Sequence, residues 1–225
     1  LKRIIPSNIK NFLKYYLPEN IFLRDSIGVI HVGASFGQEC KLYDHYNQNV
    51  IWIEPIPDVF FELKKNVKKF NKQNCYNYLV TDIDDKEYDF KITNNSLSSS
   101  IFSLEEHKKM WPEVEFSHSI SLRSITLNNL ISKENIDLNN YDTLIIDTQG
   151  SELLVLKGLG ENIKNFKYIK VEACNFKSYD GGCTDEEILS YMTNHNFKEK
   201  KRFTSSPKIH EKNYKYHDIL FQNAN

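Results

Sequence analysis

The chain has 225 residues, 40% hydrophobic and 26% charged, with a formal net charge of −1. This length and composition are enough to bury a core and favour a single domain over residues 1–225. The near-zero charge excludes a general field for nucleic acid, so short lysine clusters such as residues 198–202 are expected to be solvated faces. No apolar run approaches the roughly 20 residues that span a bilayer.

The four cysteines are scattered, without a CxxC pair or the density of a disulfide framework. No apolar signal-peptide segment opens the chain. These two features favour a reducing, cytoplasmic location. The first residue is Leu1 rather than Met, as expected of a trimmed product, a removed expression tag, or a domain cut from a longer polypeptide.

The first part of the chain alternates strands and helices. An amphipathic helix is predicted over residues 7–16, inside an N-terminal extension of residues 1–20. Next come predicted strands at residues 27–32, 50–54 and 77–81, with helices at 37–46 and 57–70. Pro57 suits the first turn of the second of these helices, where its missing N–H is not needed.

Residues 86–125 break the alternation and predict a β insertion, or lid, with antiparallel strands at 88–93 and 119–124. The rest of the chain predicts helices at 126–132, 151–158 and 185–195 and strands at 143–147, 168–172, 198–203 and 217–221. Thr184 is a suitable cap for the last helix. We therefore predict an α/β, Rossmann-like fold: a mostly parallel seven-stranded sheet with helices on both faces, an antiparallel C-terminal hairpin, and an insertion before the fourth strand.

The ends of the first three predicted strands indicate a cofactor site. Gly33 lies in the first strand-to-helix turn, where the missing Cβ lets a ligand approach the backbone. Glu54 ends the second strand 21 positions later, the spacing at which an acid accepts hydrogen bonds from a ribose diol. Asp82 ends the third strand and is a candidate acceptor from an adenine amine. The alternatives are a polar strand terminus at Glu54-Pro55 and a surface turn at Asp82.

The loop from Gly33 to Gly37 lacks the GxGxxG pattern that binds a dinucleotide pyrophosphate. A glycine loop without that pattern, a ribose-binding acid and an adenine-binding acid fit S-adenosylmethionine better than NAD. The segment that ends at Asp147 and continues as Thr148-Gln149-Gly150 places a further carboxylate at the mouth of the same crevice.

Five segments in this order resemble the FkbM-type methyltransferases. They are HVGASFGQE (31–39), WIEPIPDVFFELKKN (52–66), SLSSSI (96–101), SITLNNLI (124–131) and IDTQGSELLVLKG (146–158). The similarity covers roughly residues 27–172, and the last segment is the most specific. The resemblance implies the class I S-adenosylmethionine-dependent fold and usually O-methylation, often of sugar or polyketide hydroxyls.

One position departs from the family. Many members carry Asp where this chain has His31, and that Asp helps to orient the methionine amino group or loop waters. Glu39 is either its substitute or a first-turn acid favoured by the helix dipole. The expected cofactor-binding residues are His31, Gly33, Ala34, Ser35, Glu39, Glu54, Pro55, Asp82 and Asp147.

Methyl transfer to a hydroxyl requires alignment of the acceptor and a place for its proton. The expected catalytic residues are Asp147, Glu172 and His118. Asp147 and Glu172 end neighbouring strands, so they are expected to share a proton, bind acceptor hydroxyls, or hold Mg²⁺ or Mn²⁺. The metal is left unassigned, because acids at strand ends are commonly capped by helix N–H groups.

The expected acceptor-binding residues are Ser98, Ser99, Gln149, Asn175 and Tyr179. Trp111, Phe176 and Tyr179 are candidate platforms for a sugar ring, with core packing as the alternative. The Gly181-Gly182 pair predicts a flexible loop that covers the acceptor. Glu152 is either part of the site or a residue that closes the turn before the following helix.

The sequence thus predicts a methyltransferase that acts on a hydroxyl of a glycan or glycosylated metabolite, fused to or acting with glycosyltransferases. A NAD-dependent oxidoreductase that uses the same crevice is one alternative. A methyltransferase-like binding domain without activity is another, because His31 replaces the family Asp.

Overall fold

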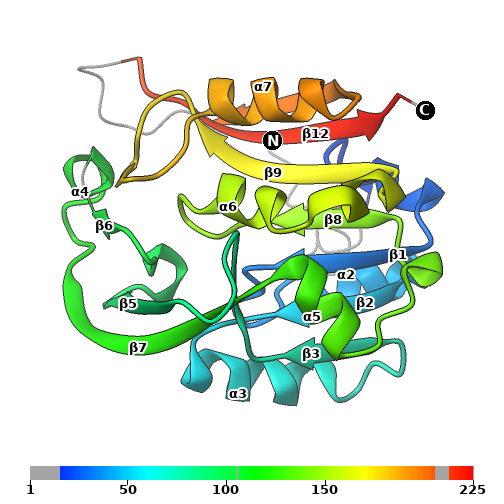
Figure 1. The fold of residues 1–225 in the computed structure, drawn as a ribbon, viewed down its shortest axis with the longest axis horizontal. Coiled ribbons are helices and arrows are strands. Elements are labelled where there is room, and N and C mark those ends of the chain that lie inside the picture. Colours follow the sequence, from blue (N-terminus) through cyan, green and yellow to red (C-terminus); the bar gives the residue numbers. More distant parts are fainter. Residues whose placement is uncertain (1–15, 105, 206–212, 225) are drawn as a thin grey trace, which may run out of the picture.

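A computed structural model describes residues 16–104, 106–205 and 213–224 of the chain. Its centre is a sheet in the order β11-β12-β9-β8-β1-β2-β3 (Figure 1). The strands are β1 (Gly28–Val32), β2 (Asn49–Ile53), β3 (Gln73–Tyr76), β8 (Thr143–Ile146), β9 (Tyr168–Cys174), β11 (Phe197–Ser205) and β12 (Tyr216–Asn223). Strands β3 to β9 of this order are parallel, and β12 is antiparallel to β9 and β11. The predicted sheet and its C-terminal hairpin are confirmed, while the helix predicted at 7–16 falls outside the described residues except for Tyr16.

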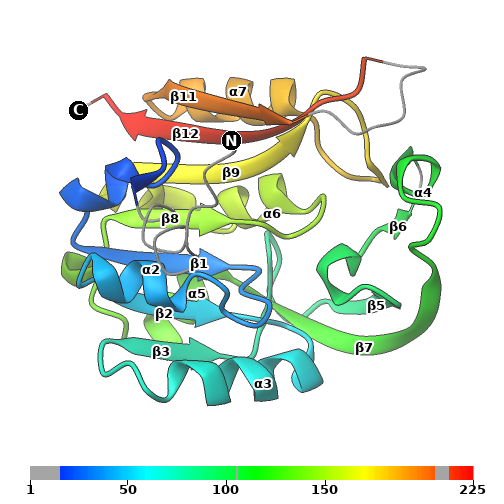
Figure 2. The same ribbon diagram turned by 180° about the vertical axis from the view of Figure 1, so that it is seen from behind.

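Helices cover both faces of the sheet. Successive side chains of a strand point to opposite faces, and in the central strands the side chains on both faces are apolar. The helices are α2 (Cys40–His45), α3 (Pro57–Val67), α5 (Leu127–Lys133), α6 (Glu152–Lys157) and α7 (Asp185–Asn194). In β2, Val50 and Trp52 pack with α2 and α3, and Ile51 and Ile53 join the cluster that includes α5, α6 and α7. Helix α2 lies in front of the sheet in Figure 2 and α6 in Figure 1.

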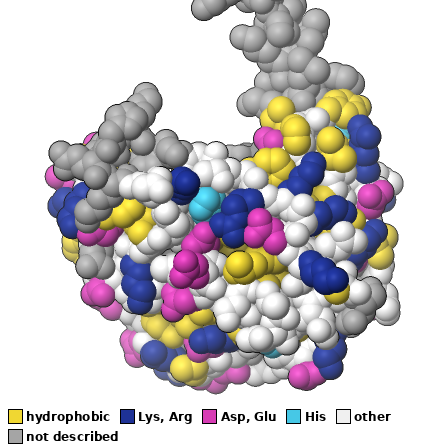
Figure 3. All heavy atoms as spheres, turned by 90° about the horizontal axis from the view of Figure 1, so that it is seen from above, with side chains coloured by type: hydrophobic (Ala, Val, Ile, Leu, Met, Phe, Trp, Pro, Cys, Tyr) yellow, Lys and Arg dark blue, Asp and Glu magenta, His cyan; other side chains and the backbone are white. Residues whose placement is uncertain are grey.

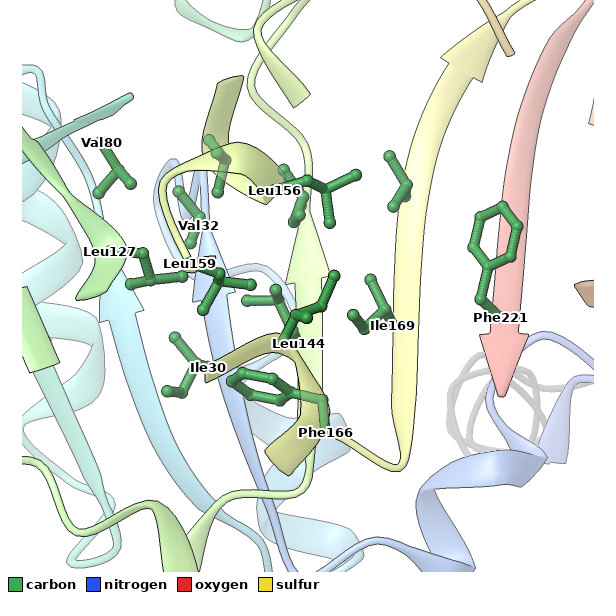
Figure 4. Packing of buried hydrophobic residues seen from close by; sticks show 14 of the residues in the cluster. Ile30, Val32, Val80, Leu127, Leu144, Leu156, Leu159, Phe166, Ile169 and Phe221 are labelled. Carbon is green, nitrogen blue, oxygen red and sulfur yellow. The ribbon is translucent and has the colours of Figure 1, made fainter. Parts of the chain in front are cut away.

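The larger apolar cluster fixes the strands that carry the candidate site. Ile30, Leu144 and Ile169 come from the neighbouring strands β1, β8 and β9 and are fully buried. They pack with Leu156 of α6 and with Phe166, as Figure 4 shows. Because this packing sets the relative positions of three strands, it also sets the positions of the loops that leave their carboxyl ends.

The prediction for the third strand is wrong. The sheet strand is β3 (Gln73–Tyr76), whereas β4 (Leu79–Thr81) leaves the sheet and pairs in parallel with residues 124–126. As an edge strand, β3 pairs on one side only and its sequence QNCY shows little apolar pattern. The apolar Leu79-Val80 pair gave the stronger signal because it is buried elsewhere.

The predicted antiparallel pair of the insertion is confirmed as β5 (Glu87–Thr93) and β7 (Phe116–Thr126). Between these strands lie three unpredicted elements, the 3₁₀ turn η3 (Ser96–Ser98), β6 (Ser103–Leu104) and helix α4 (Glu106–Met110). Strand β6 pairs with β10 (Tyr179–Asp180), which ties the loop after β9 to the insertion. Both ribbon views show α4, β5, β6 and the curve of β7 together beyond one end of the sheet (Figures 1 and 2).

The surface seen from above the view of Figure 1 carries basic and acidic side chains in mixture (Figure 3). Within the 198–202 cluster, Arg202 pairs with Asp185 at 2.6 Å and with Glu199 at 2.8 Å. These pairs agree with the expectation of a solvated hairpin rather than a basic patch. No helix in the described part of the chain is long and apolar enough to cross a membrane.

Candidate active site

The candidate site lies where the strand order reverses. Strands β1 and β8 are neighbours, and the next strands along the chain lie on opposite sides of them. The loops that leave their carboxyl ends therefore diverge and open a crevice. A cavity of ≈ 340 Å³, the main cavity, lies there. Its walls include eleven of the predicted site residues: His31, Gly33, Ala34, Ser35, Glu39, Glu54, Pro55, Ser99, Asp147, Gln149 and Glu172.

Gly33 is required by the contact between these two loops. Its φ is +84°, and an added Cβ would lie 1.7 Å from the backbone oxygen of Asp147. The glycine thus lets the loop after β1 pass directly against the loop after β8. The structure thus adds a second reason for the missing Cβ, while the approach of a ligand to Gly33, which lines the main cavity, stays a prediction.

Two residues of the main cavity have a left-handed backbone, Ser35 with φ +45° and Gln149 with φ +56°. The other four non-glycine residues with positive φ in the described ranges are Asn or Asp, which tolerate this conformation. Each of the two departures costs roughly 1–2 kcal/mol, and such strain is found most often at functional sites. The location of both strained residues on the wall of the main cavity is therefore consistent with a functional site.

Glu54 holds the loop after β1 against the start of α3. Its Oε2 accepts a hydrogen bond from the Ser35 N–H at 2.8 Å, and its Oε1 accepts one from the Ile56 N–H at 2.9 Å. Burial raises the pKa of Glu54 to about 7, although the two backbone N–H groups act in the opposite direction. Glu54 is therefore a buried acid whose charge depends on pH near neutrality.

Asp147, Glu172 and Gln149 form one hydrogen-bonded group on the cavity wall. The Gln149 Nε2 donates to Asp147 Oδ1 at 2.7 Å and to Glu172 Oε2 at 2.9 Å. The two carboxyl groups also share a hydrogen bond. The charge of Asp147, followed by burial, raises the pKa of Glu172 well above its usual range.

Ionisation of one acid therefore disfavours ionisation of the other, and the pKa values of both carboxyl groups lie above their ordinary values. Asp147 keeps exposed surface and lines the main cavity, and burial of its carboxyl group raises its pKa too. The main cavity is therefore lined by a carboxyl group of raised basicity.

Glu152 closes the turn that follows Asp147. It accepts hydrogen bonds from the Thr148 N–H at 2.9 Å, the Thr148 hydroxyl at 3.2 Å and the Gly150 N–H at 3.0 Å. Only 3% of the residue is exposed, and it is absent from the wall of the main cavity. Of the two interpretations of Glu152, the structure supports the structural one.

His31 is part of an aromatic cluster rather than a charged anchor. Its ring stacks on Trp52 at 5.0 Å between centroids, and its Nδ1 lies 3.0 Å from the Tyr43 hydroxyl. Burial, followed by the nearby charge of Lys170, lowers the pKa of His31 to about 3. The imidazole of His31 is therefore neutral. Glu39, at the start of α2, is an acid that lines the same cavity as His31.

Three predicted site residues lie apart from this group. Asp82 follows β4 instead of the third sheet strand, outside the cavity wall. His118 is exposed on β7, and its Nδ1 lies 3.1 Å from the Ser117 hydroxyl. The Asn175 side chain pairs with the backbone of Asn213 and Lys215 at 2.9 and 2.8 Å. We withdraw the chemical roles expected of Asp82, His118 and Asn175.

The remaining acceptor candidates lie next to the carboxyl pair. Tyr179 donates to Gln149 Oε1 at 2.8 Å, and the Ser100 hydroxyl donates to the Gln149 carbonyl at 2.7 Å. Tyr179 is buried, so its ring is not an open platform, and Phe176 packs on Tyr214 at 4.1 Å between centroids. Ser98 does not line the main cavity but shares η3 with Ser96, which does.

Sequence reasoning missed the apolar wall of the main cavity and one half-buried cation. The wall consists of Ile56, Tyr78, Leu79, Val80, Phe90 and Leu97. Tyr78 and Leu79 follow the true third strand, so locating β3 correctly would have revealed them. Lys170 projects from β9 into an adjoining cavity of ≈ 250 Å³ and pairs with Asp218 at 3.1 Å. No sequence signal marks it, because a strand lysine usually faces solvent.

A metal-binding cluster is not among these features. In residues 16–104, 106–205 and 213–224, no three His, Cys, Asp or Glu side chains are arranged to hold a metal ion. Asp147 and Glu172 instead take up hydrogen bonds from Gln149 and from each other. The two acids are thus arranged for proton sharing.

Comparison with known proteins agrees with this architecture. Magnesium protoporphyrin IX methyltransferase from Synechocystis PCC 6803 with bound SAH is similar at TM-score 0.51 and 8% identity, over 99% of this chain and 90% of that chain. Precorrin-6y C5,15-methyltransferase from Geobacter metallireducens GS-15 has TM-score 0.48 and 11% identity, over 99% and 92%. At such identities the first likeness supports the class I methyltransferase fold alone, and the second carries no argument.

The family assignment rests on the sequence. No curated protein matched the chain. The family model described as methyltransferase FkbM domain matches residues 31–199, well over half of the chain and all of the main-cavity wall. The chain therefore belongs to the FkbM methyltransferase family.

Proposed function

We propose that the main cavity binds S-adenosylmethionine and that the protein transfers its methyl group to a hydroxyl of a glycan or glycosylated metabolite. Four features of the cavity wall follow the neighbouring strands β8, β1, β2 and β3 in this order. They are Asp147, the loop 33–39, Glu54 and residues 78–80, respectively. At about 4.8 Å per strand the row spans about 14 Å. It is polar at one end and apolar at the other, which suits an elongated ligand with an amino-acid end and a purine end.

Two buried polar groups support the cofactor. The Ser35 Oγ is buried without a hydrogen-bond partner among the described residues, although it belongs to the cavity wall. Each Glu54 oxygen accepts one backbone N–H, and a carboxylate oxygen has room for a second donor. Glu54 is therefore suited to accept a ribose diol, while Ile56, Leu79 and Val80 offer an apolar contact to adenine.

The carboxyl pair beside the cavity is the observation that carries the reaction type. When bound, S-adenosylmethionine supplies a methyl group on a positively charged sulfur. The protein must align the acceptor oxygen, a contribution of roughly 7–11 kcal/mol, and remove its proton, a contribution of roughly 10²–10⁴-fold. Asp147 is the carboxylate placed for that proton, and Glu172 and Gln149 hold it in position by hydrogen bonds.

The geometry is less suited to a nicotinamide dinucleotide. Helix α2 begins at Cys40, so seven residues separate it from the end of β1 at Val32. A dinucleotide fold instead brings the helix N-terminus directly against the pyrophosphate through a glycine-rich turn. Here Ser35 and Gln38 stand in that loop, and α2 has only six residues.

Calorimetry tests the cofactor and a transfer assay tests the acceptor. We expect S-adenosylhomocysteine to bind and NAD not to bind; tight binding of NAD alone would overturn the proposal. The transfer assay uses S-adenosylmethionine labelled in the methyl group and a panel of monosaccharide-terminated glycans, with and without EDTA. We expect the labelled methyl group to be found in an ether linkage that is stable to base. We expect EDTA not to reduce the amount of label transferred. Label found only on nitrogen or carbon acceptors would refute O-methylation.

A further inference from the structure

A second cavity lies within the insertion, separated from the main cavity by the single turn η3. This insertion cavity has a volume of ≈ 550 Å³ and is lined by Asn94, Asn95, Ser98, His107, Trp111 and Glu113, among others. Its size falls in the range of small-molecule sites, about 300–1,000 Å³. The two cavities share the η3 segment as a wall, because Ser96, Leu97 and Ser99 line the main cavity.

Trp111 presents a fixed aromatic surface to the insertion cavity. It is 41% exposed, whereas the other tryptophan, Trp52, is fully buried. Its backbone is held by hydrogen bonds with His107 at 2.9 Å and Val114 at 3.0 Å, and its side chain hydrogen-bonds to the Tyr216 hydroxyl. An anchored indole that keeps an open face loses little entropy when a ligand stacks on it.

His107 supplies a polar group that the protein itself leaves unpaired. The residue is 5% exposed, and its Nδ1 has no hydrogen-bond partner among the described residues. A buried polar atom without a partner costs about 1–3 kcal/mol, so each such atom calls for an explanation. Burial lowers the pKa of His107 to about 4, and the neutral ring can donate or accept one hydrogen bond at each nitrogen depending on the tautomer.

The charge of the lining restricts the ligand. Among the described residues that line the insertion cavity, Glu113 is the only charged one, and none is a lysine or arginine. A phosphate, sulfate or uronate would meet an acid without a compensating cation. A neutral hexose or deoxyhexose instead offers an apolar ring face for Trp111 and hydroxyls for His107 and the Asn95 amide.

Contacts also connect the insertion cavity to the reacting groups. The His107 ring lies 5.2 Å from the Tyr179 ring, and Tyr179 donates to Gln149 at 2.8 Å. Gln149 in turn holds Asp147 and Glu172. A ligand of two or more sugar units that crosses the edge of η3 would thus have one unit at each cavity.

We propose that the insertion cavity is a subsite for the non-reacting part of a neutral oligosaccharide acceptor, with one pyranose stacked on Trp111 and hydrogen-bonded to His107. This inference rests on the proposed function, since it adds the acceptor's second unit to the same reaction. It predicts that acceptors with at least two neutral sugar units bind better than single sugars.

Tryptophan fluorescence tests the subsite in protein saturated with S-adenosylhomocysteine. Because Trp52 is fully buried, a ligand-dependent change reports mainly on Trp111. The ligands are lactose, maltose, cellobiose and methyl α-L-rhamnopyranoside, with glucuronic acid as the charged comparison. We expect a saturable change with at least one neutral sugar and none with glucuronic acid. No response to any neutral sugar, or a response to glucuronic acid alone, would overturn the subsite.

Saturation-transfer NMR with the same sugars extends the test to variants. We expect Trp111→Ala and His107→Phe each to weaken sugar binding about tenfold or more, and Trp111→Phe, which keeps a ring, to weaken it less. Phe61→Ala removes an aromatic residue that is 59% exposed on α3 and serves as the matched control without effect. If His107→Phe fails to fold by circular dichroism, His107→Gln replaces it.

Binding of S-adenosylhomocysteine separates the two proposals. Unchanged sugar binding in the Trp111 and His107 variants, with cofactor binding intact, would refute the subsite and leave the proposed function standing. Failure of the wild-type protein to bind S-adenosylhomocysteine would refute the proposed function itself. With a transferable acceptor in hand, the Trp111→Ala variant should show a raised KM for a disaccharide acceptor and an unchanged cofactor affinity.

Discussion

The proposed ribose contact of Glu54 predicts that cofactor affinity depends on pH. Its pKa rises from the ordinary value of 4.5 to about 7 because the carboxyl group is buried. The difference of about 2.5 corresponds to about 3 kcal/mol in favour of the protonated form. The contribution of the protonated Glu54 carboxyl group to the free energy of unfolding is present in full below about pH 4.5 and is lost as the pH rises through about 7.

A ribose diol that donates two hydrogen bonds needs the ionised carboxylate. With a pKa of about 7, Glu54 is about nine-tenths ionised at pH 8 and about one-tenth ionised at pH 6. The dissociation constant of S-adenosylhomocysteine should therefore rise about tenfold from pH 8 to pH 6. Glu54→Gln should remove this contribution and weaken binding at pH 8 by about 1–3 kcal/mol, since hydrogen bonds to a charged group are lost.

Isothermal titration calorimetry at pH 6, 7 and 8 measures both effects. Glu187→Gln is the matched control, because Glu187 also accepts a backbone hydrogen bond, from Thr184 at 2.9 Å, but lies on α7. Glu39 and the Asp147–Glu172 pair can add their own pH dependence, and only the part lost in Glu54→Gln belongs to Glu54. An equal pH slope in wild type and Glu54→Gln would refute the ribose role.

Three further substitutions test the turns and the carboxyl pair. Gly33→Ala should destabilise the fold by more than the roughly 1–2 kcal/mol of a left-handed alanine, because its Cβ would lie 1.7 Å from the Asp147 backbone oxygen. Urea unfolding measures the loss of stability, and Gly160→Ala is the control because Gly160 has φ +53° and open space around it. Equal losses of stability in the two variants would contradict the contact. Asp147→Asn should lower the single-turnover rate at saturating S-adenosylmethionine by about 10²-fold or more, so full activity would exclude Asp147 as the base. Glu152→Gln should cost about 1–3 kcal/mol of stability, because the amide nitrogen cannot accept the backbone N–H groups; unchanged stability would contradict the turn-closing role.

The parts of the fold that the sequence predicts well are those determined by local contacts. Thr184 caps α7 through a capping box with Glu187, and both residues lie within one turn of the chain. The nearly continuous apolar runs in β1, β2 and β8 reflect burial on both sheet faces. Glu54 is predictable for the same reason, since its place at the end of a buried strand fixes which edge of the sheet it reaches.

The parts that were missed depend on partners distant in sequence. Strand β3 draws its stability from one neighbour, so QNCY carries little pattern of its own. In the sequence, Asn175 resembles an active-site amide. In the structure, both polar atoms of its side chain hydrogen-bond to the backbone at residues 213–215. The insertion cavity needs Asn95 and Trp111 to meet across sixteen residues of sequence, and no short spacing encodes that meeting.

Gln149 joins the two strand-end acids to the insertion and to the loop after β9. Its amide nitrogen donates to both acids, its amide oxygen accepts from Tyr179, and its backbone oxygen accepts from Ser100. A carboxylate at this position could not donate to Asp147 and Glu172 and would place a third acid beside them. The amide hydrogen bond acts to lower the pKa of Asp147 against the effect of burial, and the residue links the strand ends to the insertion and to the loop after β9. The strained backbone of Gln149, φ +56°, is consistent with a residue held by all of these partners at once rather than by its own turn preference.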